Sequence, residues 1–455
     1  MGEQTARVDR QGARTHYRGP GARQLILCLL SPVTDPDGRD WEMNRDSGSS
    51  WLAGFKADYK AVLVEPWSPY VGAILLILAV LSLMVSGLFW GVFGGLKLWG
   101  DWFNQLIGLG NLLGLPHELD SPLMHRISLT NITLVLGAFS AALISRQFVI
   151  NRPPKLEYVW GAVGGIFMGI GATIAGGCTV GGFFVPLLHS SPAGMVMWAG
   201  LVIGALIGLK VLLWTMENIE WGTRAPPVLK VPSGLLRLYP WFGLAVFVAI
   251  LVWATQWYAS EDTKIASRAI IVVAGFAIGF IMHRSRFCVA RAIREPFMTA
   301  EGEMSKAVML ALAVGIPLAS VVFQAKLVDP YIGIPPRFWV GSLVGGVLFG
   351  IGMLFAGGCG TGSLWRVGEG HLKLWVAVFF FSWAGSTATA LLKKTGLIVA
   401  EFNLDMLEES PIGVQTYFPA MLDGWGWTYL ATGMFLLTWY ALVRYNESTE
   451  KFTLL

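Results

Sequence analysis

The sequence has 455 residues, of which 54% are hydrophobic and only 14% are charged, and its formal net charge at pH 7 is +4. Soluble domains carry about 25% charged residues, so this composition excludes an ordinary soluble protein and indicates a membrane protein. The small net charge gives no support for nucleic-acid binding. The four cysteines form no CxxC pair and no Cys/His cluster with zinc spacing, so we expect neither a metal nor another cofactor.

The chain begins with an Arg-rich stretch, and we predict that residues 1–65 form a mostly soluble N-terminal extension. From position 70 onward apolar runs of about 20 residues recur, each long enough to cross a bilayer. The sequence therefore predicts an all-α, polytopic membrane protein in contact with lipid, with about ten transmembrane helices. We expect them at residues 70–96, 129–150, 160–177, 194–214, 240–258, 268–283, 305–325, 340–358, 373–392 and 426–444.

Basic residues gather before the first predicted segment and after the second, fourth, sixth and tenth segments. All five groups fall on one side of the membrane, and positive charge favours the cytoplasmic side. We therefore predict that the N-terminus and the C-terminus are both cytoplasmic. The opposite loops are poorer in basic residues, and Lys393 and Lys394 are the exception to this scheme.

Two glycine-rich stretches repeat one another at a constant shift of 181 positions without a gap. The first reads GGIFMGIG at 164–171 and AGGCTVGG at 175–182, and the second reads GGVLFGIG at 345–352 and AGGCGTGS at 356–363. They lie in the third and the eighth predicted segments. Because these segments are five apart, an odd number, the two helices cross the membrane in opposite directions and are antiparallel. Inverted repeats of this kind are typical of secondary transporters. We place the first membrane repeat at residues 66–220 and the second at residues 240–445.

Each copy ends in a Gly-Gly pair, which predicts a break in the helix, because glycine can leave helical geometry and let a ligand approach closely. The residues that follow are expected to begin a short second helix, whose free amides and positive dipole end attract an anion. The alternative is that the glycines only allow tight helix packing. The residues expected to form the two breaks are Gly176, Gly177, Thr179, Gly357, Gly358, Gly360 and Thr361.

A cysteine follows the Gly-Gly pair in both copies, at Cys178 and Cys359. Tight packing does not explain why both thiols occupy the same place, and a weak S–H donor suits a sulfur-rich anion. A third cysteine, Cys288, ends the stretch HRSRFC at 283–288, where Arg286 makes the surroundings electropositive. This basic stretch is also explained in part as a topology anchor. We take Cys178, Cys288, Cys359 and Arg286 as candidate substrate-binding residues.

Catalytic motifs are absent from the sequence. It contains no GxSxG, no GxxxxGK[ST] and no HExxH, so we expect no enzyme, and ATP-driven transport would require a separate subunit. The predicted membrane segments hold almost no Asp or Glu, so a carboxylate proton relay is not evident.

The chain resembles the YeeE/YedE family of bacterial inner-membrane proteins at Gly176-Gly177-Cys178, at the motif GGCGTG of residues 357–362 and at the motif SRFC of residues 285–288. The resemblance covers about residues 66–445. It implies uptake of thiosulfate or a related sulfur compound, handed along by Cys178, Cys288 and Cys359. It also implies a small TusA-like sulfur carrier as a cytoplasmic partner, and the YedE branch implies selenium compounds as alternative substrates.

One departure from the family pattern concerns the SRFC motif, which lies in the second half here. Its loose echo in the first half, at residues 145–148, has Phe148 where a thiol is expected. We thus predict an inner-membrane transporter for a small sulfur-containing anion. The alternatives are a selenium transporter, a membrane sulfurtransfer or thiol-redox protein working with a TusA-like carrier, and a membrane scaffold for a sulfur or selenium pathway.

Overall fold

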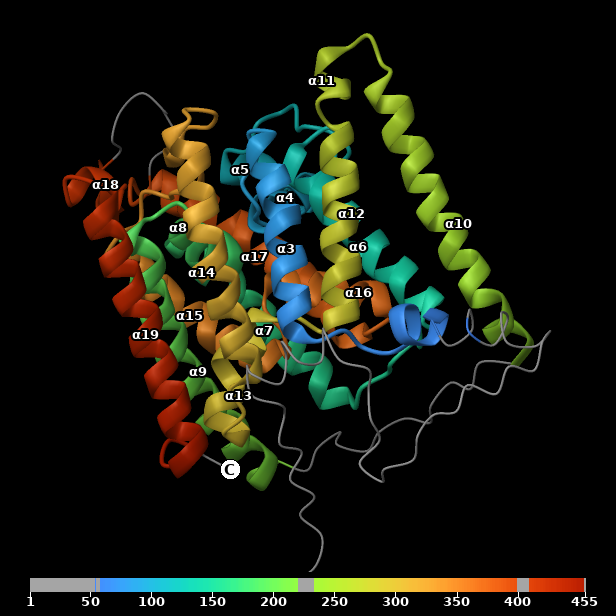
Figure 1. Cartoon of the computed structure of the whole chain (residues 1–455). Coiled ribbons are helices and arrows are strands. Elements are labelled where there is room, and N and C mark those ends of the chain that lie inside the picture. Colours follow the sequence, from blue (N-terminus) through green and yellow to red (C-terminus); the bar gives the residue numbers. More distant parts are fainter. Residues whose placement is uncertain (1–53, 55–57, 220–232, 399–408, 454–455) are drawn as a thin grey trace, which may run out of the picture. The chain divides into compact units, whose positions relative to one another are not determined.

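A computed structural model describes residue 54 and residues 58–219, 233–398 and 409–453. The chain divides into two compact units, residues 1–57 and residues 58–455. Most of the predicted N-terminal extension, including Cys28, lies outside the described residues, and its role stays a prediction. All the helices described below belong to the second unit (Figure 1).

The regular secondary structure of the described residues is almost entirely helical, as the sequence predicts. The elements up to residue 258 are η1 (Lys60–Val64), α3 (Pro69–Val85), α4 (Phe93–Leu106), α5 (Gly110–Leu113), α6 (Arg126–Ile144), α7 (Lys155–Ala175), η2 (Thr179–Phe184), α8 (Val185–Leu188), α9 (Pro192–Asn218) and α10 (Ser233–Tyr258). The later ones are α11 (Thr263–Ala266), α12 (Ala269–Ser285), α13 (Val289–Thr299), α14 (Glu303–Gln324), η3 (Pro330–Gly333), α15 (Val340–Ala356), α16 (Gly360–Glu369), α17 (Leu372–Lys394), β1 (Glu409–Ser410), β2 (Gly413–Val414), α18 (Phe418–Met421) and α19 (Trp425–Thr449). The two short strands pair antiparallel, with Glu409 opposite Val414.

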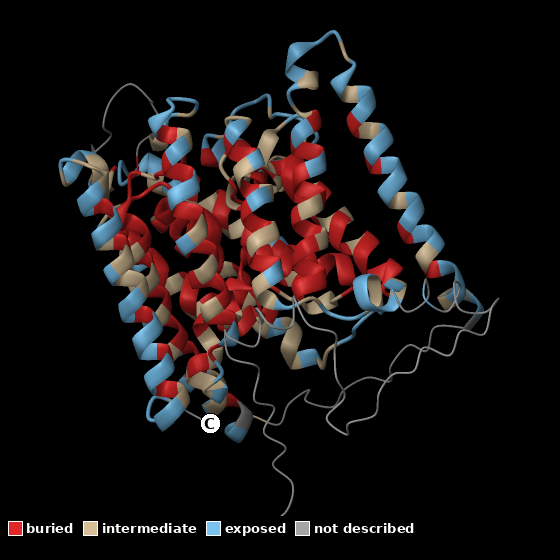
Figure 2. Ribbon diagram, viewed as in Figure 1, coloured by how far each residue is buried: buried red, intermediate tan, exposed pale blue. Residues whose placement is uncertain are grey.

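Eight helical segments among the described residues are long and apolar enough to cross a membrane. The first predicted segment corresponds to α3, a shorter apolar helix of 17 residues, and the last corresponds to α19, which has 25 residues. This architecture confirms an all-α polytopic membrane protein. Figure 2 shows the burial that goes with it: α10 and α19 expose most of their residues, whereas α7, α15 and α16 lie in the buried interior.

The predicted first span, at residues 70–96, is broken in the structure. Helix α3 ends at Val85, where Gly87 adopts a left-handed conformation with φ of +72° that glycine tolerates. A buried segment through Trp90 and Val92 then leads into α4, which lies where the sequence predicted a loop. The polar side of α4, which includes Asp101, is buried rather than solvated. In place of water, the Asp101 carboxylate accepts a hydrogen bond of 2.6 Å from the Ser386 hydroxyl on α17.

The two glycine-rich helices, α7 and α15, cross in contact with one another. A Cβ built on Gly352 would lie 2.7 Å from the carbonyl oxygen of Gly164, and one built on Gly345 would lie 2.7 Å from that of Gly171. Early residues of α7 therefore meet late residues of α15, and late residues meet early ones. The predicted antiparallel arrangement is confirmed, and these four glycines serve close packing.

A second stripe of glycines on each helix faces a different neighbour. A Cβ on Gly169 of α7 would lie 2.7 Å from the amide nitrogen of Gly385 on α17. In the other half, a Cβ on Gly350 of α15 would lie 2.7 Å from the carbonyl oxygen of Leu201 on α9. The pairs α7–α17 and α15–α9 are thus equivalent, as an inverted repeat requires. The packing explanation accounts for the glycines within the helices, but not for those at the breaks.

Helix order and direction relate the remaining elements of the two halves. The helices α3, α4, α6, α7, α9 and α10 correspond in order to α12, α13, α14, α15, α17 and α19. With this correspondence the residue before α13, Cys288, matches Val92, the residue before α4. We propose that the boundary between the repeats falls after Tyr258, so that α10 completes the first repeat instead of opening the second.

The echo of the SRFC motif at residues 145–148 is not the counterpart of Cys288 in this arrangement. That echo follows α6, and α6 runs parallel to α12: Gly275 lies against Thr130, and the later Gly137 lies against Phe280. Parallel helices cannot be exchanged by an inverted repeat. The similarity of the two stretches reflects two helices that end on the same side of the protein.

Candidate functional site

Each of the three described cysteines is the residue immediately before a short or half-length helix. Cys178 precedes η2, Cys288 precedes α13 and Cys359 precedes α16. The backbone of Cys178 has φ of −73° and ψ of −175°, and that of Cys359 has φ of −77° and ψ of 179°. This agreement shows that the duplicated sequence builds the same local structure twice. It confirms the predicted break and the predicted second helix in both copies.

The breaks bring the three cysteines together in the interior. A Cβ on Gly362 would lie 3.1 Å from the Sγ atom of Cys288 and 3.2 Å from that of Cys359. A Cβ on the neighbouring Gly360 would lie 3.2 Å from the Cβ atom of Cys178 and 3.0 Å from a methyl carbon of Val92. All three cysteines are buried and none is in a disulfide. Gly360 and Gly362, in the first turn of α16, have no side chains and so leave the space between the three cysteines free.

Hydroxyl groups at the same place lack hydrogen-bond partners among the described residues. Thr361 and Ser363, both in the first turn of α16, are fully buried, and neither hydroxyl oxygen has a partner. The side chain of Thr179, at the start of η2, is fully buried and faces the Cys359 thiol. Buried polar groups are normally hydrogen-bonded. Unsatisfied hydroxyls beside thiols and helix N-termini are therefore suited to binding a small polar or anionic ligand.

The predicted Gly-Gly pairs have two different structural roles. Gly176 and Gly357 adopt left-handed conformations, with φ of +78° and +84°, and end α7 and α15. Gly177 and Gly358 lie inside the turn that follows, where a Cβ on Gly177 would approach the Gly181 backbone to 2.6 Å. These four residues shape the backbone, whereas Thr179, Gly360 and Thr361 belong to the central cluster.

Arg286 is not part of the central cluster. Its guanidinium group forms an ion pair with the buried carboxylate of Glu369, the last residue of α16, and donates a hydrogen bond of 2.7 Å to the side-chain oxygen of Gln147. The Nε2 atom of His283 lies 3.0 Å from the same carboxylate, and that of His371 lies 3.4 Å from its second oxygen. The cluster of Arg286, His283, His371 and Glu369, called here the Glu369 cluster, occupies the end of α16 opposite to Cys359.

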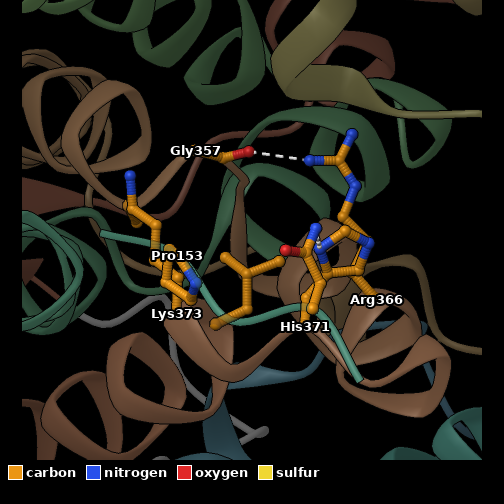
Figure 3. Close-up of a pocket in the computed structure, with 8 residues that line it drawn as sticks. Pro153, Gly357, Arg366, His371 and Lys373 are labelled. Atoms are coloured by element: carbon orange, nitrogen blue, oxygen red, sulfur yellow. Dashed lines mark hydrogen bonds between the residues drawn. The ribbon is translucent and has the colours of Figure 1, made fainter. Parts of the chain in front are cut away.

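A pocket of about 160 Å³ opens beside this end of α16 (Figure 3). Arg366, His371 and Lys373 line it, together with Gly357, the residue at the second helix break. Arg366 donates a hydrogen bond of 2.9 Å to the Gly357 carbonyl oxygen, and Lys373 pairs with Glu157. The pocket thus connects basic side chains with the backbone that leads to Cys359.

Glu369, His283 and Gly362 are not among the site residues selected from the sequence, although His283 and Gly362 lie within the motifs HRSRFC and GGCGTG. The local sequence does not indicate a role for Glu369, because it stands at the end of a helix among charged residues that look solvated. Only the fold shows that α16 is almost wholly buried and that its two ends carry the thiols and the carboxylate. No group of three or more His, Cys, Asp or Glu side chains in the described part of the chain is arranged to hold a metal ion.

Comparison with known proteins agrees with this architecture. The sequence profile of a family described as sulphur transport matches residues 42–207 and 284–454. The chain is 28% identical over 329 residues to the probable transporter YedE of Escherichia coli K12, covering 69% of this chain and 79% of that protein. It is 34% identical over 110 residues to the thiosulfate transporter TsuA of the same organism, which covers 24% of this chain and 31% of TsuA. A second thiosulfate transporter TsuA, from Spirochaeta thermophila, is 33% identical over 118 residues and is matched over 35% of its length.

The family match covers well over half of the sequence and includes both glycine-rich helices with their cysteines. Its description names transport, in agreement with the expectation that the chain is a membrane transporter and not an enzyme. The chain belongs to the sulphur transport family.

Proposed function

We propose that the protein takes up thiosulfate or a related small sulfur-containing anion through the bacterial inner membrane. The observation that carries this proposal is the meeting of Cys178, Cys288 and Cys359, each at the start of a different helix, beside the unpartnered hydroxyls of Thr361 and Ser363. The two partial relatives named as thiosulfate transporters support the choice of substrate. Selenium analogues of this anion are the alternative substrates.

The proposed binding mode divides the task between charge and sulfur. The free amides and positive dipole ends of α16 and α13 stabilise the negative charge of the anion. The thiols act as weak S–H donors to its sulfur and oxygen atoms, and their low hydration favours a sulfur-rich anion over sulfate. The three thiols come from both halves of the repeat and lie together in the interior. The anion can therefore pass from one thiol to the next without leaving the buried cluster.

The proposed orientation follows from the basic side of the protein. Arg286, Arg366 and Lys373 lie at the end of α16, on the side where α6 and α12 end. Positive charge favours the cytoplasmic face, so this end is the inner one and both termini face the cytoplasm. A TusA-like sulfur carrier is the expected cytoplasmic partner.

Uptake of ³⁵S-labelled thiosulfate tests the proposal in cells that lack other thiosulfate importers. We expect Cys178→Ser, Cys288→Ser and Cys359→Ser each to reduce uptake strongly while protein levels in the membrane hold. Cys28→Ser is the matched control, because Cys28 belongs to the N-terminal extension that the sequence predicts to be soluble, and it should transport normally. Full uptake by all three variants, at normal protein levels, would show that the thiol cluster is not the pathway.

A second candidate function is favoured by the closeness of Cys288 and Cys359. A membrane sulfurtransferase needs a thiol with a nearby resolving partner, and the fold supplies this pair although the sequence has no CxxC. In that reaction a cysteine thiolate attacks the outer sulfur of thiosulfate, the sulfur–sulfur bond breaks, sulfite leaves and a cysteine persulfide remains. Mass spectrometry after thiosulfate exposure separates the two functions. A gain of one sulfur atom at Cys288 or Cys359 favours sulfurtransfer, and unmodified cysteines favour transport.

A further inference from the structure

Glu369 is a carboxylate held in the protein interior by positively charged or protonatable side chains from two other helices. It is 5% exposed. Arg286 and His283 reach one of its oxygens from the end of α12, and His371, at the start of α17, reaches the other. A buried carboxylate costs several kcal/mol of solvation unless its partners replace the lost water. The surroundings of Glu369 are therefore built to bind an oxyanion, and a protein side chain now fills that place.

The neighbourhood remains electropositive when Glu369 is counted. Arg284 donates a hydrogen bond to the backbone oxygen of Glu65, and Arg366 donates to that of Gly357, so two further arginines have neutral partners. The guanidinium groups of Arg286 and Arg366 lie 5.5 and 5.2 Å from the ring centre of Trp365. An excess of positive charge with low-dielectric walls raises the local concentration of anions.

An unused donor belongs to a side chain that borders this region as well. The indole nitrogen of Trp365 is buried, and it has no hydrogen-bond partner among the described residues. Trp365 is 1% exposed, and its ring meets the His283 ring edge to face at 6.2 Å. Buried indole N–H groups normally find an acceptor. This donor points independently to a ligand beside the Glu369 cluster.

The position of the cluster relates it to the thiols. Helix α16 has ten residues, which corresponds to about 15 Å, and it runs from Cys359 at one end to Glu369 at the other. Arg286 stands only two residues before Cys288 in the chain. On the other side, His371 and Arg366 line the pocket of about 160 Å³. The Glu369 cluster therefore lies beside an opening at the protein surface, at the opposite end of α16 from Cys359.

We propose that Arg286, His283 and His371 form a second anion subsite, which the Glu369 carboxylate occupies when no transported anion is there. An anion that arrives from the thiols displaces Glu369 and takes its place on Arg286, whose planar guanidinium suits oxyanions with two or more oxygens. The carboxylate thus closes the inner end of the pathway and competes with the anion. This subsite rests on the proposed function for the identity of its ligand, and its geometry is tested separately.

The test measures how fast charged thiol reagents modify Cys288 in the purified full-length protein in lipid nanodiscs, without thiosulfate. Methanethiosulfonate reagents carrying a sulfonate or a trimethylammonium group are compared on a Cys28→Ser background, with peptide mass spectrometry as the readout. Glu369→Gln frees Arg286, so we expect the anionic reagent to react about tenfold faster than in the unchanged protein, and the cationic reagent not to gain. Arg286→Gln removes the guanidinium partner of the carboxylate and should reverse this preference, which keeps the test decisive if either variant fails to fold.

Glu447→Gln is the matched control, because Glu447 on α19 forms its ion pairs with Lys306 and Arg444, outside the Glu369 cluster. It should leave both rates unchanged. Equal rates in Glu369→Gln and the unchanged protein, or an equal gain for both reagents, would overturn the subsite. Failure of the proposed function has a different signature, since thiosulfate would then neither enter cells nor slow the modification of Cys288 in any variant.

Discussion

Replacing Gly362 with alanine places one methyl group between the thiols of Cys288 and Cys359. Its carbon would lie 3.1 Å from the Sγ atom of Cys288 and 3.2 Å from that of Cys359, so the thiols must move by a few tenths of an ångström. Alanine gains about 1 kcal/mol of helix propensity over glycine, and overpacking costs about 1–3 kcal/mol. The free energy of unfolding should therefore fall by no more than about 2 kcal/mol, and the variant should fold.

The effect on transport should be much larger than the effect on stability. If the anion passes between these thiols, it must displace the added methyl group, and a barrier higher by about 1–3 kcal/mol slows uptake roughly 5- to 150-fold. The assay is labelled thiosulfate uptake at matched protein levels. Gly433→Ala in α19 is the control, because no atom lies within 4 Å of a Cβ at that position. Unchanged uptake by a folded Gly362→Ala protein would refute a pathway between Cys288 and Cys359.

Two further predictions concern stability. Gly352→Ala should reduce the monodisperse fraction in size-exclusion chromatography, because its Cβ would lie 2.7 Å from the Gly164 carbonyl oxygen. Gly426→Ala is the control and should not reduce it, because no atom lies within 4 Å of a Cβ at that position. Equal monodisperse fractions for the two variants would contradict the close crossing of α7 and α15. Burial lowers the pKa of His189 from 6.5 to about 4, although the Pro330 carbonyl oxygen lies 2.7 Å away. The unfolded chain therefore binds more protons between these pH values, and lowering the pH from 7 to 5 should cost about 2 kcal/mol of stability in thermal unfolding. His189→Gln should lose that pH dependence, and an unchanged dependence would show that this ring is not its source.

The helix breaks could be predicted because their cause is local. Glycine at positions 176 and 357 permits left-handed backbone whatever surrounds it, and the repetition of the motif marked it as a designed feature. The break near Gly87 escaped prediction, because a single apolar run from 70 to 96 is long enough to cross a bilayer and gives no sign of a bend. The role of Arg286 was only half visible, since a sequence shows a charge but not the partner that neutralises it.

The sequence by itself determined the membrane class, the antiparallel repeat, the two breaks and the identity of the thiols, because each depends on composition, periodicity or the conformational freedom of single residues. Only the tertiary structure decided that Cys178, Cys288 and Cys359 share one cluster, that Val92 takes the place of a fourth thiol, and that Glu369 is buried against Arg286. These relations depend on how helices that are far apart in the chain pack together, and residue spacing along the chain carries no measure of that distance.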